Sequence, residues 1–147
     1  DIVGRVVASQ QAFRNRNYLE EIVAAGTHFN DEGLRYLQKY PRLRDLNLQD
    51  TKITDAGLKH LQHMQNLEFL ELSGTQISDV GLYYLQNLSN LKIMIACDTQ
   101  VSNEGAKKLH NELPSVCISW GKGVSGFKNI PSCVGVQRFN KNDKKDE

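Results

Sequence analysis

The chain has 147 residues, of which 39% are hydrophobic and 24% are charged, so it is long enough and apolar enough to fold around one core. Eighteen basic and seventeen acidic residues leave a formal charge of +1, which argues against a protein built to coat nucleic acid or a membrane surface. No apolar run approaches the roughly eighteen residues of a membrane-spanning helix. All leucines fall between Leu19 and Leu113, so composition divides the chain into a leucine-rich middle and two flanks.

The chain begins with the flank that lacks leucine. Its apolar residues can share one face of a helix, and they are Ile2, Val3, Val6, Val7 and Phe13. We predict that residues 1–18 form an N-terminal capping helix, because the first coil of a stacked array needs its exposed core covered.

The middle of the chain, residues 19–120, repeats itself every twenty-four residues. Threonine, glycine, acidic and leucine residues each recur at this interval. Their columns are Thr27, Thr51, Thr75 and Thr99; Gly33, Gly57, Gly81 and Gly105; Asp31, Asp55 and Asp79, with Asn103 in the fourth place; and Leu37, Leu61, Leu85 and Leu109. So many columns in one register indicate about four full repeats preceded by a leading strand.

Each repeat opens with a short strand and a tight turn. Residues 67–72 alternate apolar and polar side chains toward their end, which is the pattern of a half-buried strand. Ser73 and Gly74 then turn the chain. The threonine column lies where the chain leaves the strand, and we expect its hydroxyl groups to bond with backbone groups of that turn.

A short helix completes each repeat. Ser78 or Asp79 can cap its start with a side-chain oxygen. A spacing of three residues places three leucines on one helix face, namely Leu82, Leu85 and Leu88. We explain the glycine column by close approach at the packed start of each helix. Because neither strand nor helix can bury its apolar side alone, the repeats are expected to stack, with parallel strands on one surface and helices on the other.

The pattern L-x-x-L-x-L-x-x-T-x-I-[TS]-D-x-G-L-x-x-L resembles the leucine-rich repeat family over roughly residues 19–120. Threonine replaces the Asn or Cys that this family usually has at the strand exit. The T-x-I-T-D-A-G-L form is more narrowly similar to bacterial, planctomycete-type repeats. The resemblance implies an α/β leucine-rich-repeat solenoid, a right-handed β-α superhelix with short parallel strands on a concave face and helices on a convex face. It also implies a binding role but no substrate.

A second resemblance leaves an alternative open. Repeats of F-box-type ubiquitin ligase adaptors share the D-x-G-L helix start. The chain would then be a scaffold or substrate-recognition fragment of a larger multidomain protein, either an F-box-like adaptor or a bacterial multidomain protein. Residues 1–18 are too short for an F-box-like segment, so the sequence that precedes Asp1 would distinguish these possibilities.

The C-terminal part begins with one more strand. Ile118 and Trp120 stand in the columns of Met94 and Ala96, so we predict a last strand in which Trp120 closes the core. Residues 121–147 form a tail of different composition. We expect the apolar residues within 121–139 to fold back onto the solenoid, and residues 140–147 to be disordered because they are polar and charged.

No pattern in the sequence favours catalysis or metal binding. The three cysteines form no C-x-x-C pair, and no nucleophile elbow, phosphate-binding glycine loop or zinc-protease histidine pair occurs. We interpret His60 and His63 as surface residues and expect Cys97 and His110 to lie apart. Asp55 and Asp79 recur as helix-start residues rather than as a catalytic pair. We therefore predict a non-enzymatic chain with no catalytic residue, no cofactor and no metal.

The candidate binding site lies on the concave face, which we define as the surface formed by strand side chains that point away from the core. Phe69 and Ile93 are expected to be cross-strand neighbours, and Ile95 lies two residues along on the same side. Outward-facing apolar side chains are unexpected unless something covers them. The predicted partner-binding residues are Asp45, Asn47, Phe69, Glu71, Ile93 and Ile95.

Two coverings of this apolar cluster compete. A partner protein can place an apolar anchor there, with Asp45 and Glu71 selecting a basic rim. Alternatively, the segment 121–139 can curl over the cluster with Phe127 or Ile130. We favour a protein partner of unknown identity and predict a monomer.

The helix side offers a weaker candidate. Basic and aromatic residues interleave there in two columns, which are Arg35, Lys59, Tyr83 and Lys107, and Tyr36, His60, Tyr84 and Lys108. Such a mixture can bind RNA or phosphates. A solvated helix face is the commoner meaning, and the net charge near zero argues against nucleic acid.

Overall fold

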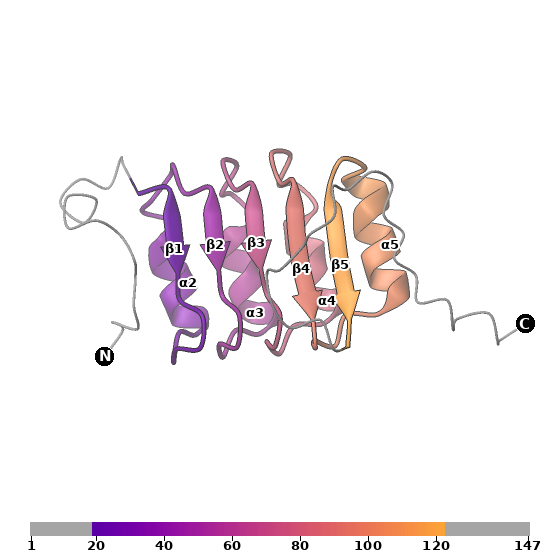
Figure 1. Cartoon of the computed structure of the whole chain (residues 1–147). Helices are drawn as coiled ribbons and strands as arrows, with labels where there is room; N and C mark the ends of the chain where they lie inside the picture. The colour runs from indigo at the N-terminus through magenta and orange to yellow at the C-terminus, as the bar shows by residue number, and fades with distance from the viewer. Residues whose placement is uncertain (1–18, 123–147) are drawn as a thin grey trace, which may run out of the picture.

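The computed structural model describes residues 19–122, and they form a row of stacked β-α repeats (Figure 1). Five parallel strands lie side by side in chain order, and the helices pack behind them as a second layer. The strands are β1 (Glu21–Val23), β2 (Asp45–Asn47), β3 (Phe69–Glu71), β4 (Ile93–Cys97) and β5 (Cys117–Gly121). This is the predicted α/β solenoid, and the predicted last strand is β5. The predicted capping helix 1–18, and the tail beyond residue 122, lie outside the described residues.

The register of the sheet confirms the twenty-four-residue period. Asp45 pairs with Phe69, Phe69 with Ile93, and Ile93 with Cys117. Every step from one strand to the next therefore equals one repeat. Residues of one sequence column consequently become neighbours in space.

The helical segments are shorter than the sequence pattern suggested. They are α2 (Asp31–Leu37), α3 (Asp55–Leu58) followed by the 3-10 helix η2 (Lys59–Leu61), α4 (Asp79–Leu82) followed by the 3-10 helix η3 (Tyr83–Leu85), and α5 (Asn103–Glu112). Leu88 was expected on the same helix face as Leu82 and Leu85, but the helical segment ends at Leu85 and Leu88 is buried beyond it. A spacing of three matches the 3-10 helix, whose side chains at i and i+3 eclipse.

The leucine columns form one continuous core between the two layers. Residues of the strand columns, such as Leu46 and Leu70, are fully buried, as are the helix leucines Leu61 and Leu85. Trp120 is partly buried and packs against the end of this core. Its indole Nε1 donates a hydrogen bond to Oδ1 of Asn103 at 2.8 Å, so the ring is held where the prediction placed it, at the last coil.

A left-handed turn follows each of the first four strands. One residue per repeat has a positive φ, and these residues are Gly26, Asp50, Gly74 and Asp98. Glycine and aspartate tolerate this conformation better than most residues. The threonine hydroxyls close the turn as predicted, each donating to the carbonyl three residues earlier at 2.6–2.7 Å, from Thr27, Thr51, Thr75 and Thr99.

Aspartate side chains join each repeat to the next. Ser78 is the N-cap of α4, since its hydroxyl accepts from the Val80 N–H, whereas Asp79 reaches into the following repeat. There the Asp79 carboxylate accepts from Ser102 N at 2.8 Å and from Ser102 Oγ at 2.5 Å. The same pairs recur between Asp31 and Thr54 and between Asp55 and Ser78.

This aspartate ladder explains the glycine column. A Cβ at Gly105 would collide with the carboxylate of Asp79, and the same holds for Gly81 against Asp55. The close approach that the sequence predicted is therefore an approach to the aspartate of the preceding repeat at Gly57, Gly81 and Gly105, whereas Gly33 lies against the ring of Phe29.

Candidate functional site

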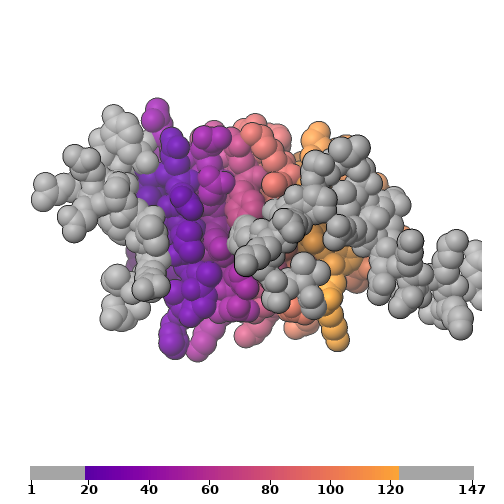
Figure 2. Space-filling model, viewed as in Figure 1, coloured from indigo at the N-terminus to yellow at the C-terminus, as the bar shows by residue number. Residues whose placement is uncertain are grey.

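The sheet brings all six predicted partner-binding residues onto the concave face. Asp45, Phe69 and Ile93 form one row across β2, β3 and β4, and the second row lies two residues along, with Asn47, Glu71 and Ile95. Figure 2 shows this face in space-filling form, with the repeats following one another in chain order. The sheet backbone holds these side chains in fixed positions before any partner arrives.

Three apolar side chains form a strip on the concave face. Phe69, Ile93 and Ile95 are each half-buried, unlike the core leucines beneath them, which are fully buried. Phe69 also borders a hollow of about 260 Å³ on the side of β1, whose other lining residues are Glu21, Ile22, Val23, Asp45, Leu46 and Asn47. An aromatic wall beside two carboxylates suits a side chain with an apolar stem and a positive end.

Glu71 occupies an unusual position for a carboxylate. Its side chain is only 4% exposed, and Oε1 accepts a hydrogen bond from the backbone N of Ser73 at 2.8 Å. Burial raises the pKa of this carboxyl group, the bonds from Ser73 partly oppose that rise, and the negative charge of Asp50 adds to it. Asn47, one repeat earlier, accepts in the same way from Gln49 N at 3.0 Å. Both side chains therefore shape the strand exit, and only the half-buried Asn47 also contributes to the surface.

Cys97 lies at the end of β4 and is fully buried. Its backbone N donates to Ser73 Oγ at 3.2 Å, and its sulfur lies 3.7 Å from Ser119 Oγ. Burial raises the pKa of the thiol, with further contributions from the charges of Glu71 and Asp98. A protonated, buried thiol is a poor nucleophile. The side chain of His110 is engaged elsewhere, at 3.3 Å from the carbonyl of Val116.

A ladder of alternating charges precedes the strands, and the sequence analysis missed it. Arg44 and Lys92 both bind the carboxylate of Glu68, at 2.8 Å and 2.5 Å, and Arg44 also lies 4.0 Å from Glu20. The hydrogen bond from Lys92 is the largest cause that lowers the pKa of Glu68. The signal was available, because these residues form one twenty-four-residue column in which the sign of the charge alternates.

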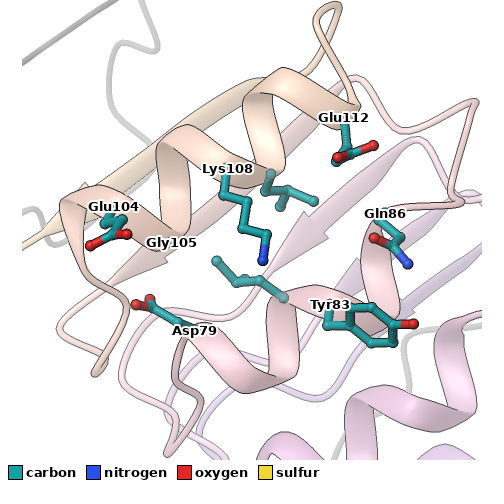
Figure 3. A pocket seen from close by; sticks show the side chains of 9 residues that line it. Asp79, Tyr83, Gln86, Glu104, Gly105, Lys108 and Glu112 are labelled. Atoms are coloured by element: carbon teal, nitrogen blue, oxygen red, sulfur yellow. The ribbon is translucent and has the colours of Figure 1, made fainter.

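A second hollow lies on the convex face between α4, η3 and α5 (Figure 3). It has a volume of about 220 Å³, and Lys108 reaches from α5 toward it. Tyr83, whose side chain is 64% exposed, forms part of the opposite wall. The remaining lining residues are Asp79, Leu82, Gln86, Glu104, Gly105, Leu109 and Glu112. The sequence predicted Tyr83 and Lys108 on this side of the molecule, but it did not predict the hollow. The hollow lies where the ten-residue helix α5 follows the shorter helical segment that ends with η3.

Residues 19–122 contain neither a cluster of metal-ligating side chains nor a membrane-spanning helix. Within that range no group of three or more His, Cys, Asp or Glu side chains is placed to hold a metal ion. No helix within the same range is both long enough and apolar enough to cross a membrane.

Comparisons with known proteins concern the fold. Residues 41–61 and 63–85 match the family model described as Leucine Rich repeat. An internalin from Listeria monocytogenes (inlF) is similar in structure, with a TM-score of 0.54 and 19% identity over 74% of this chain and 37% of that chain. Internalin C2 from the same organism has a TM-score of 0.54 and 20% identity over 81% of this chain and 60% of that chain. No curated protein sequence matches the chain.

These likenesses confirm that the chain contains leucine-rich repeats and that its fold is a leucine-rich-repeat solenoid. The chain spans only 37% and 60% of the lengths of the two internalins. At such low identity the likeness is one of fold alone. The planctomycete-type form of the repeat stays a prediction.

Proposed function

We propose that this leucine-rich-repeat solenoid is a non-enzymatic protein–protein interaction module that binds a partner protein on its concave face. Leucine-rich repeats are in general modules for such interactions, which supports the broad class. The proposed contact residues on this face are Asp45, Asn47, Phe69, Ile93 and Ile95, and the predicted sixth residue, Glu71, is buried beneath them.

The observation that carries the proposal is the apolar strip of Phe69, Ile93 and Ile95 on the concave face. These side chains are only half-buried although the core beneath them is closed. Covering them with a partner's apolar side chain removes hydrocarbon from water, at roughly 25 cal/mol per Å². Because the sheet fixes their positions, binding needs little rearrangement of the backbone.

Carboxylates beside the apolar strip indicate that the edge of the partner's contact surface carries basic residues. Asp45 lies next to Phe69 in the sheet and, with Glu21, lines the neighbouring hollow. A lysine or arginine at the edge of the partner would match these carboxylates and select for orientation. Glu71 is buried, so it acts on the strand exit and adds to the negative potential from beneath the surface.

The module is expected to act as a monomer, without nucleic acid as its ligand. The bacterial, planctomycete-type repeat remains our preferred description of the sequence. The same concave face would serve if the solenoid is the scaffold or substrate-recognition part of a larger protein.

An affinity pull-down with matched variants tests the proposal. The chain carrying both Phe69→Ala and Ile93→Ser is compared with the wild type and with a convex-face control, Tyr36→Ala with Tyr83→Ala. The control removes two aromatic side chains that are 48% and 64% exposed, so it changes exposed aromatic area on the opposite face. We expect the partner to be lost from the concave variant and retained by the control.

Thermal unfolding of the same proteins separates binding from folding. The concave variant should melt close to the wild type, since the truncated side chains are only half-buried. Equal recovery of the partner by the wild type and the concave variant would refute the proposal. So would loss of the partner from the convex control alone.

A further inference from the structure

The hollow on the convex face has apolar side chains exposed along one wall. Val80 and Tyr83, two of the three large apolar side chains exposed among residues 19–122, lie on the helical segment α4–η3 that forms this wall. We propose that the hollow is a second docking site, which binds an amphipathic helix of a partner protein. That helix carries a basic–acidic–basic face and one large apolar side chain. The site is separate from the concave face and does not depend on the function proposed for it.

The repeat columns show that this apolar pair is particular to one repeat. All members of the two columns are exposed to solvent. The column of Val80 has glutamate in the first and last repeats, at Glu32 and Glu104. The column of Tyr83 is otherwise basic, with Arg35, Lys59 and Lys107. The fold therefore does not require apolar side chains at these positions, and a contact with another molecule explains them better.

A change in the last repeat accompanies the hollow. The helix α5 extends to Glu112, further than the helical segments of the two repeats before it. The two preceding members of the Glu112 column, Met64 and Leu88, are buried in the core, whereas Glu112 is exposed. The apolar filling that this column supplies between the earlier coils is thus replaced at the last coil by a charged side chain at the surface.

The hollow has room for one large apolar side chain. Its volume is about 220 Å³, and its lining includes Leu82 and Leu109, which are each 3% exposed. An apolar cavity of about 150 Å³ holds a benzene molecule, so the ring of a phenylalanine fits here. Covering the ring of Tyr83 at the same time removes further hydrocarbon from water, and this burial supplies the affinity.

Three charged side chains of α5 line the hollow at intervals of four residues. Glu104 and Glu112 lie toward its two ends, and Lys108 lies between them and reaches toward α4 and η3 (Figure 3). A spacing of four residues places all three on one face of the helix. The ion pairs among residues 19–122 involve other side chains and none of these three. Their acidic–basic–acidic pattern is therefore open to a partner whose charges are reversed.

A helix suits this groove better than an extended segment. The hollow lies between α4–η3 and α5, whose backbone groups bond within their own segments. An extended segment buried there would leave its N–H and C=O groups without partners, whereas a helix satisfies its own. Residues four apart on the bound helix rise by about 6 Å, which matches the spacing of Glu104, Lys108 and Glu112.

The charge pattern argues against a second copy of the chain as the occupant. If two copies of α5 docked about a twofold axis, Lys108 would face Lys108 and glutamates would face glutamates. Like charges at such positions destabilise the contact. We therefore assign the hollow to a different protein.

Fluorescence anisotropy with two synthetic peptides tests the site. Both peptides are alanine-rich and about eighteen residues long, which is enough to form a helix, and each carries one phenylalanine. On the face beside the phenylalanine, the first peptide has Lys, Glu and Lys at intervals of four residues, and the second has Glu, Lys and Glu. We expect the full chain at low salt to bind the first peptide several-fold more tightly than the second. Equal binding of the two peptides, or binding of neither, would overturn the inference.

A charge-reversed variant shows which residues read the peptide. The triple change Glu104→Lys, Lys108→Glu and Glu112→Lys should reverse the preference, so that the second peptide binds more tightly. Glu32→Lys is the matched control, since it makes the same net change of charge in the column of Glu104, and it should keep the wild-type preference. Tyr83→Ala should weaken both peptides several-fold. Circular dichroism verifies that each variant is folded, and a folded triple variant with the wild-type preference would contradict the site.

The concave variant distinguishes the two faces. The chain with Phe69→Ala and Ile93→Ser should bind the first peptide as the wild type does, although it is expected to lose the partner of the concave face. Loss of the peptide from this folded variant would place the peptide on the concave face and overturn this inference. Retention of the peptide, together with unchanged capture of the other partner, would refute the proposed function and leave this inference standing.

Discussion

At the scale of a single residue, the buried carboxyl group of Glu71 makes folding sensitive to pH. Its pKa in the folded chain is raised by burial, whereas in the unfolded chain it stays near 4.5. Between these two values the unfolded chain binds fewer protons than the folded chain. Stability contributed at this site is therefore present at low pH and is lost as pH rises through the window above 4.5.

Substitution of Glu71 by Gln tests this linkage. The amide oxygen can still accept from Ser73 N, but the side chain no longer ionises. We expect the wild type to lose stability relative to Glu71→Gln as pH is raised from about 4 to about 7. Urea unfolding across that range measures the difference, with Glu32→Gln as the exposed-carboxylate control. Parallel stability curves for wild type and Glu71→Gln would show that the folded chain does not raise this pKa.

At the scale of the elements, the aspartate ladder couples each helix start to the next. Asp79 makes two hydrogen bonds to Ser102, and its carboxylate fills the space above Gly105. Asp79→Ala should destabilise the chain by about 2 kcal/mol, since it removes two charge-assisted bonds. Gly105→Ala should also destabilise, by about 1–2 kcal/mol, because its Cβ meets that carboxylate.

The double variant gives the sharper result. Without the carboxylate, alanine at position 105 meets no such obstacle and favours a helix over glycine by about 1 kcal/mol. Gly105→Ala should therefore become neutral or stabilising in the Asp79→Ala background. Urea unfolding of the four proteins measures this coupling, and Val80→Ala, at a side chain 67% exposed, should change little. If the losses of stability in the two single variants simply add in the double variant, the Asp79 carboxylate is not the reason for glycine at position 105.

The features of these elements that could be predicted from the sequence are those that follow from its twenty-four-residue period. The column of Leu46 and Leu70 predicted the strands and their register correctly, because strands that repeat every twenty-four residues are expected to pair residue by residue within one column. The partner of Asp79 could not be predicted, since its bond to Ser102 crosses between repeats. The end of the helical segment at Leu85 was missed because a spacing of three fits both an α-helix face and a 3-10 helix.

The candidate site was predicted in position but not in accessibility. The columns placed Phe69 beside Ile93 correctly, since cross-strand neighbours follow from the register. They could not reveal that Glu71 is buried, because exposure depends on what lies over the sheet as well as on the sheet itself.

At the scale of the whole molecule, the two faces of the solenoid differ in character. The concave face carries the apolar strip of Phe69, Ile93 and Ile95 on a rigid sheet, whereas the convex face carries exposed aromatics such as Tyr83 over short helical segments. A stacked array stabilises itself through its core, so side chains on either face are free to vary for binding. The apolar side chains of this strip are not buried fully by the core, and we therefore propose that binding takes place on the concave face.

The most direct test of that assignment is methyl NMR of the isoleucines on addition of the captured partner, in reducing buffer. We predict that the signals of Ile93 and Ile95 shift, whereas those of Ile53 and Ile77, which are fully buried in the core, stay unchanged. Unshifted Ile93 and Ile95 signals in a chain that demonstrably binds the partner would contradict binding on the concave face and place the interface elsewhere.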